Sequence, residues 1–190
     1  MNRFFMGIAV FSGVLLLAGC GGRKTIQSTS IGDIPEWFSK TPQDQNYLYA
    51  ANTQASQDMQ LAIDKAAIGA RSEIGRQLEA KLNSLQKKFA EETGTSNDAQ
   101  LLEMFTQAEK VVVSTTLNGS KIKKSEVKKD GAMFRAYVLI EYPVGSANAA
   151  LLDQIKKHDQ MFTRFRASET FKELDAETEK YEKFKGQENH

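Results

Sequence analysis

Side chains capable of covalent, metal or acid–base chemistry are scarce in this sequence of 190 residues. Cys20 is the only cysteine, and His158 and His190 are the only histidines. A histidine–cysteine metal site needs several such ligands, so none is expected. A catalytic triad needs a positioned base, whereas His158 is predicted to lie in a charged helix beside Lys157 and Asp159, as is typical of a solvated surface. We therefore predict no metal, no catalytic residue and no enzymatic activity.

The covalent chemistry that the sequence does favour is lipidation of Cys20. Arg3 precedes an almost unbroken apolar run over residues 4–18. That run has the length of the hydrophobic region of an export signal and is too short for a transmembrane helix of about 20 residues. It ends in Leu17-Ala18-Gly19-Cys20, which resembles the bacterial lipobox. We predict that residues 1–19 are a signal peptide and that Cys20 carries diacylglycerol and N-acyl lipid, with no other cofactor.

Two or three acyl chains would make this membrane association stable, because each buried methylene contributes about 0.8 kcal/mol. Known lipoproteins that stay in the inner membrane usually have Asp after the lipidated cysteine, and this chain has Gly21. By that resemblance we predict a lipid anchor in the outer membrane. The only cysteine would be consumed by the lipid, so the domain must be held together by its core and not by disulfides.

Composition indicates one globular domain behind a tether. Removal of residues 1–19 leaves 171 of the 190 residues, enough for one domain with a substantial core. Because Arg3 is the only charged residue removed, the remainder has 24 basic and 24 acidic residues, and a nucleic-acid partner is not expected. Residues 20–33 comprise the lipidated cysteine and a flexible, polar tether. Residues 34–190 are predicted to form a single domain with a helical C-terminal tail.

A strand and a long helix are predicted to open this domain. The composition of residues 47–55 favours a strand. Apolar residues then recur every three or four positions from about residue 58 to 91, as in an amphipathic helix, and Gly94 follows as a stop signal. Alanines in the first part of the helix would allow close approach to a sheet. Larger Leu and Phe side chains farther along require a second helix or a second subunit.

A shorter helix over residues 98–110 and a three-stranded meander are predicted next. The three predicted strands cover residues 111–117, 120–129 and 133–142. Asn118-Gly119 and Asp130-Gly131 lie between them, and both dipeptides favour tight hairpin turns.

Helices are predicted after Pro143, with Ser146 or Asn148 as the cap of the first. Apolar positions continue to Tyr181 and Phe184, and charged residues between them are typical of a solvated face or of a helix that docks on a partner. The predicted class is α+β: an antiparallel sheet of a strand and a three-stranded meander, a long helix, and additional C-terminal helices.

The main basic cluster consists of Lys121, Lys123, Lys124, Lys128 and Lys129. One interpretation is an exposed hairpin whose lysines discourage pairing with other strands. The alternative is a contact surface for an anionic envelope polymer such as lipopolysaccharide.

Several segments resemble the "twenty-kilodalton" outer-membrane lipoprotein family, and the resemblance spans nearly all of the chain after Cys20. They are Pro35-Glu36-Trp37-Phe38, Asp58-Met59-Gln60-Leu61-Ala62, Thr116-Leu117-Asn118-Gly119-Ser120, Phe134-Arg135-Ala136-Tyr137-Val138-Leu139 and Thr163-Arg164-Phe165-Arg166-Ala167. The resemblance implies a role in the envelope, with flagellum-associated lipoproteins among the members. We expect an interaction module whose partners are the outer membrane, envelope or flagellar proteins, and a homo-oligomer as an open alternative. A lipoprotein binding a small ligand or polymer, in a pocket near Trp37 or Tyr137, is the second expectation.

Overall fold

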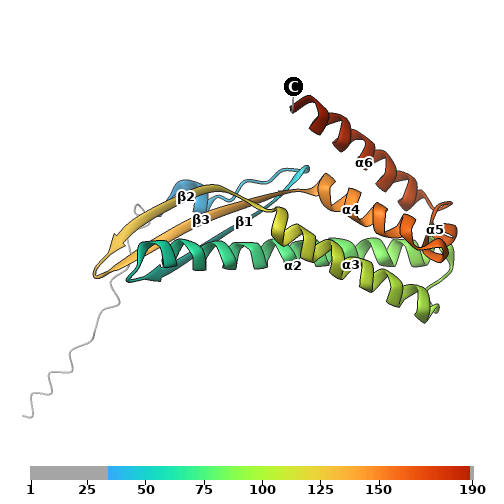
Figure 1. Cartoon of the computed structure of the whole chain (residues 1–190), viewed down its shortest axis with the longest axis horizontal. Coiled ribbons are helices and arrows are strands. Elements are labelled where there is room, and N and C mark those ends of the chain that lie inside the picture. Colours follow the sequence, from blue (N-terminus) through green and yellow to red (C-terminus); the bar gives the residue numbers. More distant parts are fainter. Residues whose placement is uncertain (1–33, 189–190) are drawn as a thin grey trace, which may run out of the picture. The chain divides into compact units, whose positions relative to one another are not determined.

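The computed structural model describes residues 34–188 (Figure 1). The predicted signal peptide over residues 1–19 and the tether over residues 20–33 therefore lie outside the described residues. The elements in chain order are α1 (Glu36–Ser39), β1 (Tyr47–Ser56), α2 (Met59–Thr93), α3 (Ala99–Gly119), β2 (Lys121–Asp130), β3 (Met133–Pro143), α4 (Val144–Lys157), α5 (Asp159–Phe165) and α6 (Glu169–Glu188). The prediction of an α+β fold with an antiparallel sheet, a long helix and C-terminal helices is confirmed.

The sheet has three antiparallel strands in the order β1-β3-β2. Strands β2 and β3 form a hairpin in which Asp130 pairs with Met133, so Gly131 and Ala132 form the loop. Gly131 has a φ of 61°, which a glycine adopts without the steric cost that a side chain would add. A positive φ at the first loop residue alone is typical of a type II′ hairpin turn. The predicted hairpin is therefore confirmed, but its loop is Gly131-Ala132 and not Asp130-Gly131, because Asp130 is paired within β2.

Helix α2 covers one face of this sheet (Figure 1). The contact is made by small side chains of the helix. The alanines that line this contact are at most 3% exposed: Ala62, Ala66, Ala67 and Ala70. They pack against the inward-facing residues of β3, which are Ala136, Val138, Ile140 and Tyr142. Asp58 caps the helix by accepting a hydrogen bond from the Leu61 backbone N–H at 2.7 Å. Gly94 ends it with a φ of 67°, as the sequence predicted.

The second half of α2 extends past the sheet and packs on helices of the same chain. Phe89 lies 4.5 Å from Phe165 and 6.0 Å from Phe105 between ring centroids. Leu78 and Leu82 are 1% exposed. A second helix, not a second subunit, therefore covers this part of α2.

The predicted strand over residues 111–117 is wrong, because α3 continues through it to Gly119. The β-branched residues of this segment favour a strand in isolation. The buried positions nevertheless keep a helical spacing through the segment: Leu101, Phe105, Ala108, Val112 and Thr116. Thr115 and Thr116 also donate hydrogen bonds to the carbonyls four residues earlier, at 2.9 and 2.8 Å. Burial against α2 therefore determines that this segment is helical. Of the predicted three-stranded meander, only the β2–β3 hairpin forms.

Three further boundaries differ from prediction. Asn118-Gly119 is the last part of α3 and not a hairpin turn, and Asn118 donates a hydrogen bond to the Ser114 carbonyl at 3.3 Å. Helix α4 begins at Val144, directly after Pro143, so neither predicted cap initiates it. His158 separates α4 from α5 instead of lying within one charged helix.

Helix α1 contributes to the opposite face of the sheet. Phe38 meets Tyr137 of β3 edge to face, with 5.0 Å between ring centroids. Trp37 lies 6.2 Å from Phe38, also edge to face, and is half-buried. Trp37 therefore contributes to packing on this face of the sheet.

Candidate functional site

The predicted lipidation site, Leu17-Ala18-Gly19-Cys20, lies outside the described residues. None of the helices within residues 34–188 is long and apolar enough to cross a membrane.

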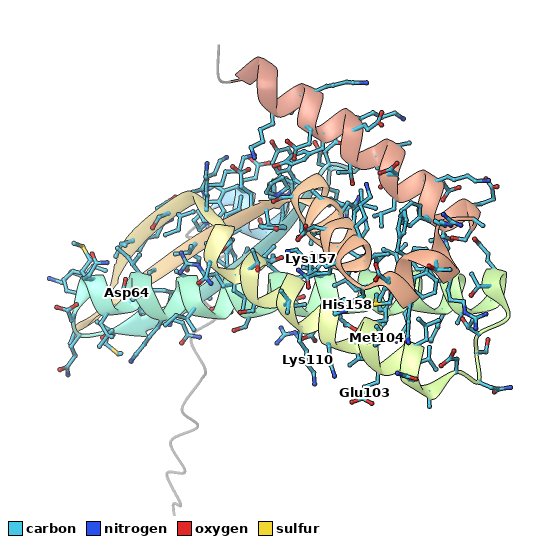
Figure 2. All side chains as sticks on the ribbon, turned by 45° about the vertical axis from the view of Figure 1, so that its right-hand side comes forward. Asp64, Glu103, Met104, Lys110, Lys157 and His158 are labelled. Carbon is cyan, nitrogen blue, oxygen red and sulfur yellow. The ribbon has the colours of Figure 1, made fainter. Side chains whose placement is uncertain are left out.

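The labelled titratable side chains of α2 and α3 do not converge on His158. Figure 2 shows His158 far from Asp64 of α2, while Glu103 and Lys110 project outward from α3. Over residues 34–188, no three His, Cys, Asp or Glu side chains come close enough together to hold a metal ion. His158 is only half-buried.

The predicted lysine cluster occupies β2, an edge strand of the sheet. Residues opposite each other in an antiparallel pair point to the same face. Lys121, Lys124 and Lys128 are opposite Glu141, Leu139 and Arg135, so they lie on the face away from α2. Lys129 is opposite Phe134 and lies on the α2 side. The structure therefore divides the cluster between two faces.

Lys123 lies at the irregularity in register between Ile122 and Lys124 and is held by its neighbours. Its Nζ is 2.7 Å from a Glu141 carboxylate oxygen and donates to the Tyr49 hydroxyl at 3.0 Å. These two hydrogen bonds raise the pKa of Lys123 above its usual value. The ammonium also lies 4.8 Å from the centre of the Tyr49 ring, within the range of a cation–π interaction. Lys123 is therefore a structural contact within the sheet.

The remaining lysines of the cluster differ in availability. Lys128 forms an ion pair with Glu126 at 3.3 Å. Lys121, Lys124 and Lys129 are exposed and form no ion pair within residues 34–188. Those three side chains are the part of the predicted polymer surface that is open to an anionic partner.

A groove that the sequence did not predict lies between α6 and the junction of β3 with α4. Its volume is about 470 Å³. Three aromatic side chains line it: Tyr47 from the start of β1, and Tyr181 and Phe184 from α6. Lys81 of α2 and Lys180 of α6 add two cations. The groove therefore combines residues from five elements, namely β1, α2, β3, α4 and α6.

Glycine at position 145 allows α6 to approach α4 at the groove. A Cβ at this position would overlap the Tyr181 side chain. Asn148 of α4, which is 3% exposed, donates a hydrogen bond from Nδ2 to Glu177 at 2.7 Å. The Val144 N–H donates to the Asn46 carbonyl at 2.8 Å, which holds the segment before β1 against α4. These contacts fix the two walls of the groove relative to each other.

The opposite end of α6 is held by an acidic side chain of α2. Glu92 accepts hydrogen bonds from the Thr170 backbone N–H at 3.0 Å and from the Thr170 hydroxyl at 2.6 Å. These bonds lower the pKa of the Glu92 carboxyl, the hydroxyl contributing most. Lys156 and Asp175 add an ion pair between α4 and α6 at 3.1 Å.

Two sequence interpretations change at this site. Phe184 was expected to make an apolar contact but is 49% exposed on the groove. The groove does not lie near Trp37 or Tyr137, where the sequence predicted the alternative pocket. Tyr137 is covered by Phe38 and is only 5% exposed. The spacing of Tyr181 and Phe184 places both on one face of a helix, which is the only sequence signal of the groove.

Comparison of the chain with models of known protein families and with curated proteins finds no match.

Proposed function

We propose that this chain is a lipoprotein anchored in the bacterial outer membrane, acting as a structural or interaction module of the cell envelope. The observation that carries the proposal is Leu17-Ala18-Gly19-Cys20 at the end of an apolar run over residues 4–18. The resemblance to the twenty-kilodalton outer-membrane lipoprotein family supports the same role. Envelope or flagellar proteins are the proposed partners, and a second copy of the chain remains an alternative.

The described domain supports an interaction role through its surface. Several large apolar side chains are exposed outside the core, among them Met59 at 50% and Ile68 at 62%. Charged residues occupy most of α6, whose outer face remains accessible. We propose that contacts with envelope proteins form through these exposed side chains and the outer face of α6, which the lipid would keep close to the membrane.

Replacement of the lipidated residue tests the anchor directly. The Cys20→Ala chain should leave the outer-membrane fraction, while Gly22→Ala, which keeps the lipobox and Gly21, should remain in it. Gly21→Asp should move the chain toward the inner membrane. The measurement is density-gradient fractionation followed by crosslinking and mass spectrometry of captured proteins. Identical fractionation of Cys20→Ala and the unaltered chain would refute the proposal.

A second candidate function is contact with an anionic envelope polymer through β2. The supporting observation is that Lys121, Lys124 and Lys129 are exposed without an ion pair in residues 34–188. Replacing all three by Gln should weaken binding to purified lipopolysaccharide and leave the melting temperature unchanged. The control replaces Lys65, Lys87 and Lys110, exposed lysines of α2 and α3, by Gln. Equal binding by both triple variants would exclude a specific role for β2.

A further inference from the structure

The groove between α6 and the β3–α4 junction has aromatic walls suited to a flat, partly apolar ligand. Tyr47 and Tyr181 are half-buried, and Phe184 is 49% exposed. The three rings come from segments more than 130 residues apart in sequence, and the fold gathers them on one hollow. Aromatic faces bind the C–H faces of sugar rings by burying apolar surface while leaving the hydroxyl groups at the ring edge accessible.

Polar side chains accompany the rings in the groove. Gln45, Asn46 and Asn148 each provide an amide that both donates and accepts hydrogen bonds. Asn148 is held in place by its bond to Glu177. A few fixed polar groups beside apolar faces are typical of sites that orient a hydroxylated ligand. The polar walls make a lipid tail a poor occupant, because its burial would remove the exposed side-chain amides of Gln45 and Asn46 from water without giving them partners.

Two lysines in the lining favour a negatively charged ligand in the groove. Lys81 and Lys180 line it and form no ion pair within residues 34–188. The one carboxylate in the lining, Glu177, is engaged by Asn148. A ligand that carries carboxylates would therefore meet two cations and one carboxylate already occupied by a hydrogen bond.

From these observations we infer that the groove binds an acidic sugar chain, with sugar rings on Tyr47, Tyr181 and Phe184 and carboxylates near Lys81 and Lys180. Its volume of about 470 Å³ lies within the range of about 300–1,000 Å³ typical of ligand sites. Tyr47 also stacks on Tyr49, with 6.1 Å between ring centroids, so the aromatic surface continues beyond the groove along β1. An elongated chain fits such a surface better than a single compact ligand.

This inference goes beyond the proposed membrane anchor and does not depend on it. The groove is formed by residues between Gln45 and Phe184, and neither Cys20 nor the lysines of β2 belong to its lining. Failure of the fractionation experiment would leave it standing, and failure of the sugar-binding experiment would leave the anchor standing.

Calorimetric titration of the full-length chain in detergent tests the inference. The acidic probe is tetragalacturonate, the neutral probe is chitotetraose, and inorganic phosphate controls for simple anion binding. We expect saturable binding of tetragalacturonate, weaker binding of chitotetraose and none of phosphate. Phe184→Ala should weaken both oligosaccharides about fivefold through the lost aromatic contact. Lys81→Gln with Lys180→Gln should reduce tetragalacturonate binding to the level of chitotetraose.

Matched variants separate the groove from the rest of the surface. Lys183→Gln lies on the same helix and outside the lining, and Met133→Ala removes an exposed apolar side chain of β3. Both should bind tetragalacturonate like the unaltered chain. The inference is overturned if tetragalacturonate does not bind saturably, if phosphate displaces it, or if the groove variants and the control variants bind equally.

Discussion

The two halves of α2 solve different packing problems. Its first half contacts the sheet through Ala62, Ala66 and Ala70, each fully buried. Its second half meets α3 and α5 through large side chains such as Phe89, which is also fully buried. The first half of α2, the sheet half, packs closely on the sheet because its side chains are small. The second half, the helical half, must fill the wider space among three helices. The comparison predicts opposite sensitivities: the helical half to loss of volume and the sheet half to added volume.

Truncation of Phe89 is expected to have the largest effect. Phe89→Ala would remove ring contacts with Phe105 and Phe165 and leave a cavity, so the free energy of unfolding should fall by about 3–5 kcal/mol. Phe184→Ala, at an exposed position, should change it by no more than about 0.5 kcal/mol. Urea denaturation followed by circular dichroism measures both. Similar losses in the two variants would show that the phenylalanine cluster is not the core of the helical half.

Enlargement of an alanine tests the sheet half. Ala66→Leu would force additional atoms between α2 and β3, and overpacking typically costs about 1–3 kcal/mol. Ala80→Leu, at an exposed position of the same helix, should change stability by no more than about 0.5 kcal/mol. The measurement is again the free energy of unfolding from urea titration. An unchanged free energy of unfolding in Ala66→Leu would mean that the contact between α2 and the sheet can accommodate a larger side chain.

The same contrast explains what the sequence predicted. In the sheet half, short-range patterns agree with the fold. Successive residues 136–142 of β3 point alternately toward α2 and away from it, Gly131 lies in the hairpin loop, and the alanines mark the face of α2 that packs on the sheet. In the helical half, β-branched residues of 111–117 suggested a strand because local preference and tertiary burial disagree there. The helical spacing from Leu101 through Val112 to Thr116 is the pattern that prevails.

The candidate site was less predictable than the fold. The lysines of β2 were identified, but their pairing with Glu141 and Glu126 depends on register and on a local irregularity. The groove depends on the crossing of α4 and α6, which Gly145 permits by close approach to Tyr181. A single sequence does not indicate which side chains of distant helices will come together. Nothing in it therefore predicted that Lys81 of α2 and Tyr181 of α6 would line the same groove.

Gly69 offers a finer test of closeness in the sheet half. A Cβ at this position would lie 2.7 Å from the Asn52 side chain of β1, so Gly69→Ala should require Asn52 to move. Alanine is favoured over glycine within a helix by about 1 kcal/mol, which opposes this steric cost. In an Asn52→Ala background, Gly69→Ala should therefore stabilise the chain by about 0.5–1 kcal/mol. A double-mutant cycle of unfolding free energies measures the coupling, and additive effects would contradict the close contact.

The smallest expected effect concerns a buried carboxyl in the helical half. Glu109 of α3 is 8% exposed, and burial, followed by the nearby Glu79, raises the pKa of its carboxyl. Below the pKa of the unfolded chain, about 4.3, the group is protonated in both states and costs no stability. As pH rises from there through the raised pKa of the folded state, the unfolded chain loses its proton first and stability falls.

Glu109→Gln should remove this loss while keeping an oxygen that accepts the hydrogen bond from Asn83, which is 3.3 Å in length. The variant should therefore be more stable than the unaltered chain at pH 7 and similar to it at pH 4. Glu103→Gln, at an exposed position of the same helix, should leave the pH dependence unchanged. Melting temperatures between pH 4 and pH 7 measure the difference. An equal shift with pH in all three chains would show that solvent screens Glu109, and that the helical half is less tightly closed than the sheet half.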